Sequence, residues 1–200
     1  LTPLKNKVDV SISCWEWKMG ESKAGKFSGA RCKISKWIRI DSRSQPMQAK
    51  SAANYSNAAL ARVEALKAGY DEAIMLNNKG HVAEGSAENI FVIKNGRITT
   101  PPLSADILNG ITRNSAIQMI KASGKKINEK NITVKNLLAA DEIFMTGTAA
   151  EVKSVTRVNR AKIGSGEIGP FTKELQSSFM DVVMGKNKKF LTWLKSVSYT

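Results

Sequence analysis

The stretch FVIKNGRIT at residues 91–99 does most to define the fold expected for this chain. Its two halves are rich in residues that favour strands, and Asn95-Gly96 between them is a strong signal for a tight β-hairpin. The apolar run Glu72–Leu76 upstream predicts another strand, and the polar residues 77–80 after it predict a turn. These segments place antiparallel β-structure near the middle of the chain.

Segments on either side add helices and further strands. The run Ser51–Lys67 predicts a helix that Gly69 ends, and Thr112–Ser123 predicts a helix that Gly124 ends. The other expected elements are strands at Val8–Ile12, Cys32–Trp37 and Glu142–Thr146, and a late helix at Phe171–Met184 with Leu175, Phe179, Val182 and Val183 facing inward. No internal linker is visible, so the sequence predicts one α/β domain.

The composition is that of a globular domain. Two hundred residues with 42% hydrophobic content suffice for one real core. No stretch approaches the ~18 apolar residues that a membrane span needs, and the first residues lack the pattern of a signal peptide. Cys14 and Cys32 have no metal-ligand or C-x-x-C spacing, so we expect buried or free thiols in a reducing compartment and a cytoplasmic location.

The formal charge of +14 raises the question of a nucleic-acid partner. The lysines are scattered, and neither an RNA-module signature nor a basic stripe with interleaved aromatics is present. Anionic substrates and cofactors also favour basic surroundings. We therefore expect only weak, salt-sensitive binding of nucleic acid and no specific nucleic-acid function.

Two glycine-rich stretches look like nucleotide fingerprints by their letters alone. Residues 20–27 nearly fit a P-loop, but Phe27 stands where a hydroxyl should bind magnesium. Residues 164–169 fit G-x-G-x-x-G but precede a helix near the chain end, not an early βαβ unit. The second stretch is better interpreted as a turn.

Four motifs, in chain order, carry the chemistry. They are QAKSAANY at 48–55, EGSAEN at 84–89, GITR at 110–113 and GTAAE at 147–151. Together they resemble the class IV (fold-type IV) pyridoxal-phosphate aminotransferases, and within them the chain looks like a branched-chain amino acid aminotransferase. The resemblance implies that residues 1–200 form the C-terminal large, cofactor-binding domain, with mixed strands in a barrel-like arrangement flanked by helices. The small N-terminal domain of the family is expected to be missing from this chain.

The resemblance assigns roles to three residues that would contact pyridoxal phosphate. Lys50 would hold the cofactor covalently and then shuttle a proton, which requires an amine that is partly neutral. Its neighbours in the sequence predict a close-packed, uncharged setting; they are Ala49, Ala52 and Ala53. Tyr55 would donate a hydrogen bond to the phenolic oxygen, and Glu84 would pair with the ring nitrogen and keep it protonated.

Further residues are expected around these three. Glu88 would belong to the network near the cofactor, or it would form an ion pair with Arg113. A helix that begins near Thr112 supplies N–H donors for a phosphate, and the resemblance adds Ile111 and Thr148 as phosphate ligands. Thr148 and Ala149 would also present N–H groups to the substrate carboxylate.

One tryptophan is expected in the substrate pocket. Trp17, not Trp15, matches the substrate-pocket tryptophan of the family, although a core tryptophan fits nearly as well. His81 is the single histidine and is given no role, and with no cysteine pair we expect no metal site.

The resemblance implies reversible amino transfer between leucine, isoleucine or valine and 2-oxoglutarate, in an enzyme that forms a dimer or a higher homo-oligomer, with no membrane partner. Two alternatives remain open. The first is a D-amino acid aminotransferase or aminodeoxychorismate lyase of the same superfamily. The second is a catalytically silent, basic binding module.

Overall fold

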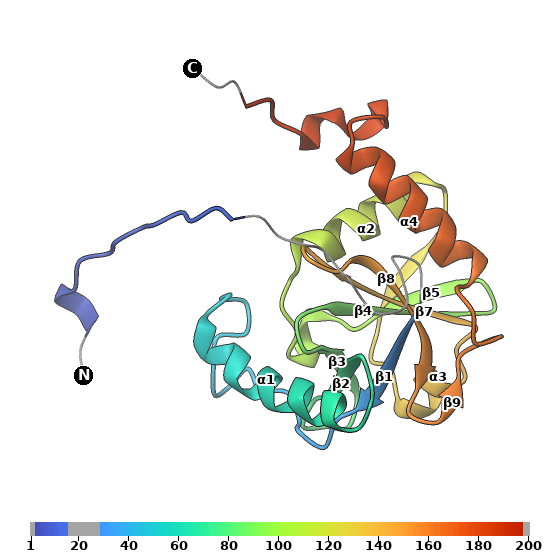
Figure 1. Ribbon diagram of the computed structural model, residues 1–200, viewed down its shortest axis with the longest axis horizontal. Helices are drawn as coiled ribbons and strands as arrows, with labels where there is room; N and C mark the ends of the chain where they lie inside the picture. The colour runs from blue at the N-terminus through green and yellow to red at the C-terminus, as the bar shows by residue number, and fades with distance from the viewer. Residues whose placement is uncertain (1–2, 16–28, 198–200) are drawn as a thin grey trace.

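The computed structural model describes residues 3–15 and 29–197. Within them, nine strands form one curled, mixed sheet in the order β3-β2-β1-β8-β7-β4-β5-β6, with β9 beside β8 (Figure 1). The strands are β1 Ala30–Ile34, β2 Glu72–Leu76, β3 Val82–Gly85, β4 Asn89–Lys94, β5 Arg97–Thr100, β6 Ile127–Glu129, β7 Glu142–Gly147, β8 Glu151–Val158 and β9 Ala161–Lys162. Strand β1 is parallel to both β2 and β8, and β5 is parallel to β6. The expected α/β architecture with mixed strands flanked by helices is confirmed.

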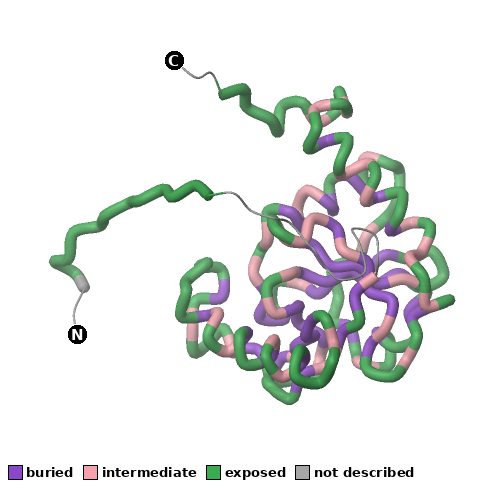
Figure 2. The backbone as a smooth tube through the Cα atoms, in the orientation of Figure 1, coloured by how far each residue is buried: buried purple, intermediate pink, exposed green. Residues whose placement is uncertain are grey.

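The helices are α1 Ala52–Lys67, α2 Ile111–Ala122, α3 Val134–Leu138 and α4 Pro170–Val183, with short 3₁₀ helices at Pro3–Lys5, Leu103–Ala105 and Lys188–Trp193. Figure 1 shows α2 and α4 side by side on one face of the sheet, and α1 near the β1–β2 side. Their apolar faces and the sheet form the core, where the buried residues of Figure 2 concentrate.

Helix α1 begins and ends where the sequence predicts. The Ser51 side chain caps its N-terminus by accepting from the Ala53 N–H, and Gly69 follows its end with φ +80°, a backbone conformation that glycine adopts without cost. The helix buries a row of alanines, Ala58, Ala61 and Ala65, against β2. Small side chains let α1 lie close to the sheet, which fixes the position of the residues just before it.

The predicted hairpin is present as β4 and β5. Asn95 and Gly96 both have positive φ, 48° and 70°, the geometry of the tight turn that matches strand twist. Strand β4 also pairs with β7, and the Phe91 and Phe144 rings stack with centroids 4.6 Å apart. The hairpin is therefore joined to the rest of the sheet through β4 and β7, and it lies toward the β6 edge.

Three sequence predictions were wrong: one whole strand, the end of another strand, and one residue expected to face inward. Residues 8–12 form no strand: they are exposed and run away from the body of the molecule (Figure 1), because alternation alone cannot supply a neighbouring backbone to pair with. Strand β1 ends at Ile34, not Trp37. At the next residue, the Ser35 hydroxyl donates to Glu64 Oε2 at 2.7 Å. Val183 is 46% exposed, since α4 buries Val182 next to it and a helix turns adjacent residues apart.

Strands β3, β6, β8 and β9 and helix α3 were not predicted. Strand β8 is the longest in the sheet, but polar and apolar residues do not alternate strictly in its sequence EVKSVTRV. Helix α3 has only five residues and depends on a capping box between Thr133 and Asn136. The glycine-rich stretch at 164–169 is a turn before α4, as the sequence indicates.

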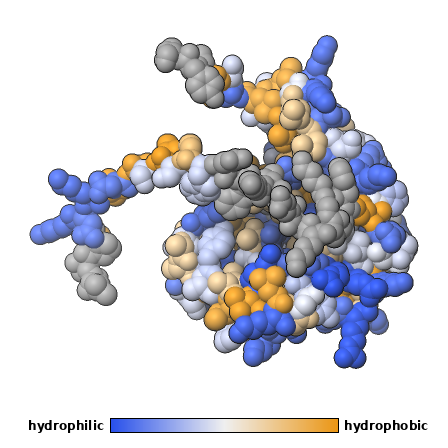
Figure 3. Space-filling model, in the orientation of Figure 1, coloured by the Kyte–Doolittle hydropathy of each residue, from blue (hydrophilic) through white to orange (hydrophobic). Residues whose placement is uncertain are grey.

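In Figure 3, hydrophilic groups occupy several separate places on the visible face, with apolar groups between them. The described ranges 3–15 and 29–197 contain no helix long and apolar enough to cross a membrane.

Candidate active site

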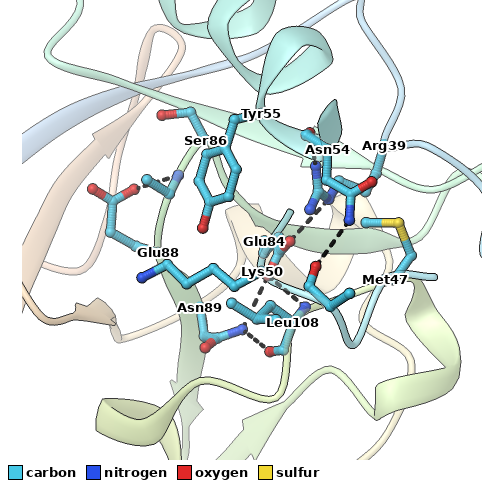
Figure 4. Close-up of a pocket in the computed structure, with 12 residues that line it drawn as sticks. Arg39, Met47, Lys50, Asn54, Tyr55, Glu84, Ser86, Glu88, Asn89 and Leu108 are labelled. Atoms are coloured by element: carbon cyan, nitrogen blue, oxygen red, sulfur yellow. Dashed lines mark hydrogen bonds and ion pairs between the residues drawn. The ribbon is translucent and has the colours of Figure 1, made fainter. Parts of the chain in front are cut away.

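A pocket opens where three segments meet: the loop before α1, the turn between β3 and β4, and residues 106–110, which lead into α2 (Figure 4). Its lining includes Lys50, Tyr55, Glu84 and Glu88. The fold thus brings together four of the residues singled out in the sequence, from positions far apart along the chain.

Lys50 and Tyr55 enter the pocket from the loop and first turn of α1 (Figure 4). Burial raises the pKa of Tyr55, and the nearby Glu84 carboxylate acts in the same direction, so the phenol keeps its proton and can donate a hydrogen bond. The expected close-packed setting of Lys50 is wrong for its alanine neighbours: Ala49, Ala52 and Ala53 are exposed, because α1 buries its opposite face.

The loop that carries Lys50 is held by Asn54. The buried Asn54 side-chain amide donates to the Pro46 carbonyl at 3.3 Å and to the Ala49 carbonyl at 3.0 Å. These bonds close the loop onto the first turn of the helix. The backbone that precedes Lys50 is therefore tied to α1.

Glu84 is the most connected group in the pocket. Its Oε1 lies 2.8 Å from Arg39 Nε in an ion pair that is almost completely buried. Its Oε2 accepts from the Leu108 N–H at 3.1 Å and from Asn89 Nδ2 at 3.0 Å. Burial raises the pKa of Glu84 to about 7, although the Arg39 charge and the Leu108 N–H act in the opposite direction. A carboxylate has about four acceptor sites, so Oε1 keeps capacity for one more donor.

Glu88 belongs to the same pocket. Its Oε2 accepts from the Ala87 N–H at 3.1 Å, and burial raises its pKa against the influence of that bond and of Arg62. The alternative of an ion pair with Arg113 is wrong, since Arg113 Nη2 pairs with Glu129 Oε2 at 2.6 Å. Glu84 is therefore buried and Glu88 half-buried, and both carboxyl groups line the same pocket.

The N-terminus of α2 forms a cradle beside the pocket. Gly110 precedes the helix and supplies no capping side chain, and the first N–H groups of a helix have no intrahelical partner. A Cβ at Gly110 would lie 2.2 Å from Asn89 Oδ1, so only glycine permits this close approach. Ile111 is 84% exposed and Thr112 is buried. Uncapped N–H groups and the helix dipole favour an anion here.

A buried hydroxyl lies on the neighbouring strand. Thr146 is opposite Asn89 in the β4–β7 ladder, and its Oγ1 is buried with no hydrogen-bond partner among the described residues. An unpaired buried hydroxyl is costly unless some group completes it. The Thr146 residue and the N-terminus of α2 both lie next to Asn89.

Thr148 and Ala149 lie in the exposed turn between β7 and β8 and are not part of the pocket lining. The turn is nevertheless adjacent to the pocket, since a Cβ at Gly147 would come within 3.4 Å of the Ala87 carbonyl and Glu88 Cγ. The structure places these two exposed residues at the rim of the pocket.

The remaining expectations concern residues away from the pocket. Trp17 lies outside the described residues. His81 forms an isolated bridge with Thr133 and does not line the pocket. Across residues 3–15 and 29–197, no group of three or more His, Cys, Asp or Glu side chains could hold a metal ion.

Among the side chains that hold the site in shape, Arg39, Gln48, Asn54 and Asn89 were given no role from the sequence. Three of them stand inside the quoted QAKSAANY and EGSAEN motifs, so their places were available from the sequence. Arg39 has no local pattern that sets it apart, because its partners Glu84 and Asn54 come from other segments of the chain. It is recognisable only through those contacts.

The fold and site together define a class of protein. The family model for class IV amino-transferases matches residues 2–158, and the chain belongs to that family.

Curated relatives of this chain are named branched-chain-amino-acid aminotransferases. The chain is 50% identical over 170 residues to a probable branched-chain-amino-acid aminotransferase of Aquifex aeolicus, a match that covers 84% of this chain and 55% of that protein. It is 43% identical over 187 residues to the branched-chain-amino-acid aminotransferase of Pseudomonas aeruginosa, covering 94% of this chain and 61% of that protein. The chain therefore spans a little over half the length of these curated relatives.

Solved structures of branched-chain aminotransferases are also similar to this chain. A branched-chain aminotransferase from Thermoproteus uzoniensis with norvaline has a TM-score of 0.82 and 41% identity, over 85% of this chain and 56% of that one. The branched-chain amino acid aminotransferase from Thermobaculum terrenum, in its PLP-form, has a TM-score of 0.83 and 33% identity, over 85% of this chain and 56% of that one.

Proposed function

We propose that this chain forms the cofactor-binding part of a pyridoxal-phosphate-dependent aminotransferase that acts on branched-chain amino acids. The observation that carries the proposal is one pocket that combines Lys50, Tyr55 and Glu84 beside an uncapped helix N-terminus. The names of the relatives, and the PLP-form of the Thermobaculum terrenum structure, support the same choice.

The donor set fits such a cofactor at both ends. The phosphate would bind the N–H groups of Ile111 and Thr112 at the start of α2, and the orphan Thr146 hydroxyl and Thr148 offer further donors. The Lys50 amine would hold the other end covalently, and Tyr55 would donate to the phenolic oxygen. Pyridoxal phosphate, when bound, supplies a ring that withdraws electrons from the α-carbon of the attached amino acid.

Two side chains, Glu84 and Lys50, would hold or transfer protons at the bound cofactor and substrate. Glu84 would accept from the ring nitrogen through its remaining acceptor site and hold a proton on that atom, with Arg39 as its buried counter-charge. Once the substrate amino group had replaced it on the cofactor, the free Lys50 amine would take the proton from the substrate α-carbon and deliver it to the C4′ carbon of the cofactor. Glu88 would keep a second carboxyl group close to this network.

The substrates are proposed from the relatives. Leucine, isoleucine or valine would exchange an amino group with 2-oxoglutarate, and the N–H groups of Thr148 and Ala149 at the rim would bind the substrate carboxylate. The small domain of the family would supply the remaining wall of the pocket, with Trp17 as a substrate contact from this chain. A dimeric or higher assembly and a cytoplasmic location stay predictions.

Covalent labelling tests the proposal. When the chain is incubated with pyridoxal phosphate, reduced with borohydride and digested, peptide mapping should find the phosphopyridoxyl group on Lys50, because its amine lies in the pocket. Lys50→Met should abolish this label, whereas Lys67→Met, at the far end of α1, should not. A folded chain labelled elsewhere, or not at all, would support a catalytically silent module instead.

Turnover tests the role of the second domain. The chain alone should transaminate leucine with 2-oxoglutarate poorly, since the pocket would lack one wall and water would enter. Extending it N-terminally with the corresponding segment of the Aquifex relative should raise the rate. Equal turnover of the two proteins would show that the second domain is dispensable.

A further inference from the structure

The Gln48 side chain joins two segments that are far apart in the sequence. Gln48 Nε2 donates to the Ile107 carbonyl at 3.0 Å, and Gln48 Oε1 accepts from the Asn109 N–H at 3.2 Å. One amide thus makes both bonds that a neighbouring β-strand would make. Two bonds of this kind set distance and orientation more tightly than one.

One of these segments carries Lys50, and the other leads into the N-terminus of α2. Lys50 follows Gln48 by two residues, and Asn109 is followed at once by Gly110 and the start of α2. Among the described residues, Gln48 makes the side-chain hydrogen bonds that join the lysine loop, residues 46–50, to residues 107–110. Gln48 is therefore a direct link between the lysine loop and the segment that leads into the N-terminus of α2.

The far side of the same segment is held independently. Glu84 Oε2 accepts from the Leu108 N–H, and Asn89 Nδ2 donates to the Leu108 carbonyl at 2.8 Å. The Ser42 N–H also donates to Asp106 Oδ1 at 2.9 Å. The segment therefore keeps its shape without Gln48, whose particular contribution is the link to the lysine loop.

We propose that Gln48 is a positioning residue that sets the spacing between the Lys50 backbone and the N-terminus of α2, and so matches the site to a ligand anchored at both ends. The inference rests on the proposed function, in which Lys50 holds one end of pyridoxal phosphate and the helix holds the phosphate. Spacing set in advance improves the binding of a two-point ligand because less ordering remains to be done on binding.

The test compares pyridoxal phosphate with pyridoxal, which lacks the phosphate and can be anchored only at the lysine end. Dissociation constants for both are measured by visible absorbance for the wild-type chain, Gln48→Ala and Gln48→Met. Both variants should bind pyridoxal phosphate about tenfold more weakly, the scale of two neutral hydrogen bonds, and pyridoxal within about twofold of wild type. Gln48→Met keeps the side-chain length, so it separates lost bonds from lost volume.

Gln118→Ala is the matched control, since Gln118 is an exposed amide on α2 itself and lies outside the pocket lining. It should leave both constants unchanged. Because Gln48 is exposed, its variants should fold, and thermal melting verifies this. Equal weakening of both ligands would mean a general structural role and overturn the inference, as would unchanged affinities. A folded wild-type chain that binds neither ligand would instead overturn the proposed function, and the inference with it.

Discussion

Replacing Arg39 by methionine is expected to lower the free energy of unfolding by about 3 kcal/mol or more above neutral pH, the usual cost of removing one partner of a buried ion pair. The variant would leave the Glu84 carboxylate buried without its counter-charge. It would also remove the bond from Arg39 Nη1 to the Asn54 carbonyl, 3.2 Å long. Urea unfolding of the chain without cofactor measures the loss.

The loss should depend on pH. The folded pKa of Glu84, about 7, lies above its ordinary value of 4.5, so its stabilising contribution is present below pH 4.5 and is lost as pH rises through 7. Without Arg39 the folded pKa rises further, because the Arg39 charge is the strongest influence that lowers it. The variant should therefore lose more stability than wild type above neutral pH, and the difference should shrink near about pH 5, where Glu84 is protonated in both proteins.

A double variant isolates the charge. Arg39→Met with Glu84→Gln should recover much of the stability, because no uncompensated carboxylate remains. Arg43→Met is the matched control: the Arg43 side chain that pairs with Asp41 is itself exposed, so stability should hardly change. A loss of equal size at both pH values, or no rescue in the double variant, would contradict an electrostatic role for Arg39.

Changing Glu84 to glutamine should slow amino transfer by ~10²-fold or more while the cofactor still attaches to Lys50. A neutral amide cannot hold a proton on the ring nitrogen, so the α-carbon would lose its proton more slowly. Single-turnover reaction of leucine with the cofactor-loaded, N-terminally extended protein measures the effect on chemistry apart from product release.

Glu129→Gln is a suitable control, because Glu129, on β6, pairs with Arg113 and does not line the pocket. It should leave the single-turnover rate near that of the unmodified protein. An unchanged rate in Glu84→Gln, with the borohydride label still on Lys50, would remove Glu84 from the proposed chemistry.

Much of the local structure could be predicted from the chain because the signals act over few residues. Ser51 caps the start of α1 with its hydroxyl. Gly69 after the end of α1, and Asn95-Gly96 between β4 and β5, have positive φ, a backbone conformation that few other residue types adopt readily. The alternation of residues 8–12 misled the prediction for the opposite reason. A strand exists only when another backbone pairs with it, and no local pattern supplies that backbone.

The sequence by itself determined the α/β class, the order of the main helices and strands, and the candidate residues Lys50, Tyr55 and Glu84. Only the tertiary structure decided their surroundings: that Arg39 neutralises Glu84, that Asn89 and Leu108 hold it in place, and that Gln48 joins the lysine loop to the start of α2. The physical reason is separation along the chain. Caps, turns and helical periodicity depend on residues within a few positions, whereas ion pairs and bridging amides depend on which distant segments the folded sheet brings within about 3 Å.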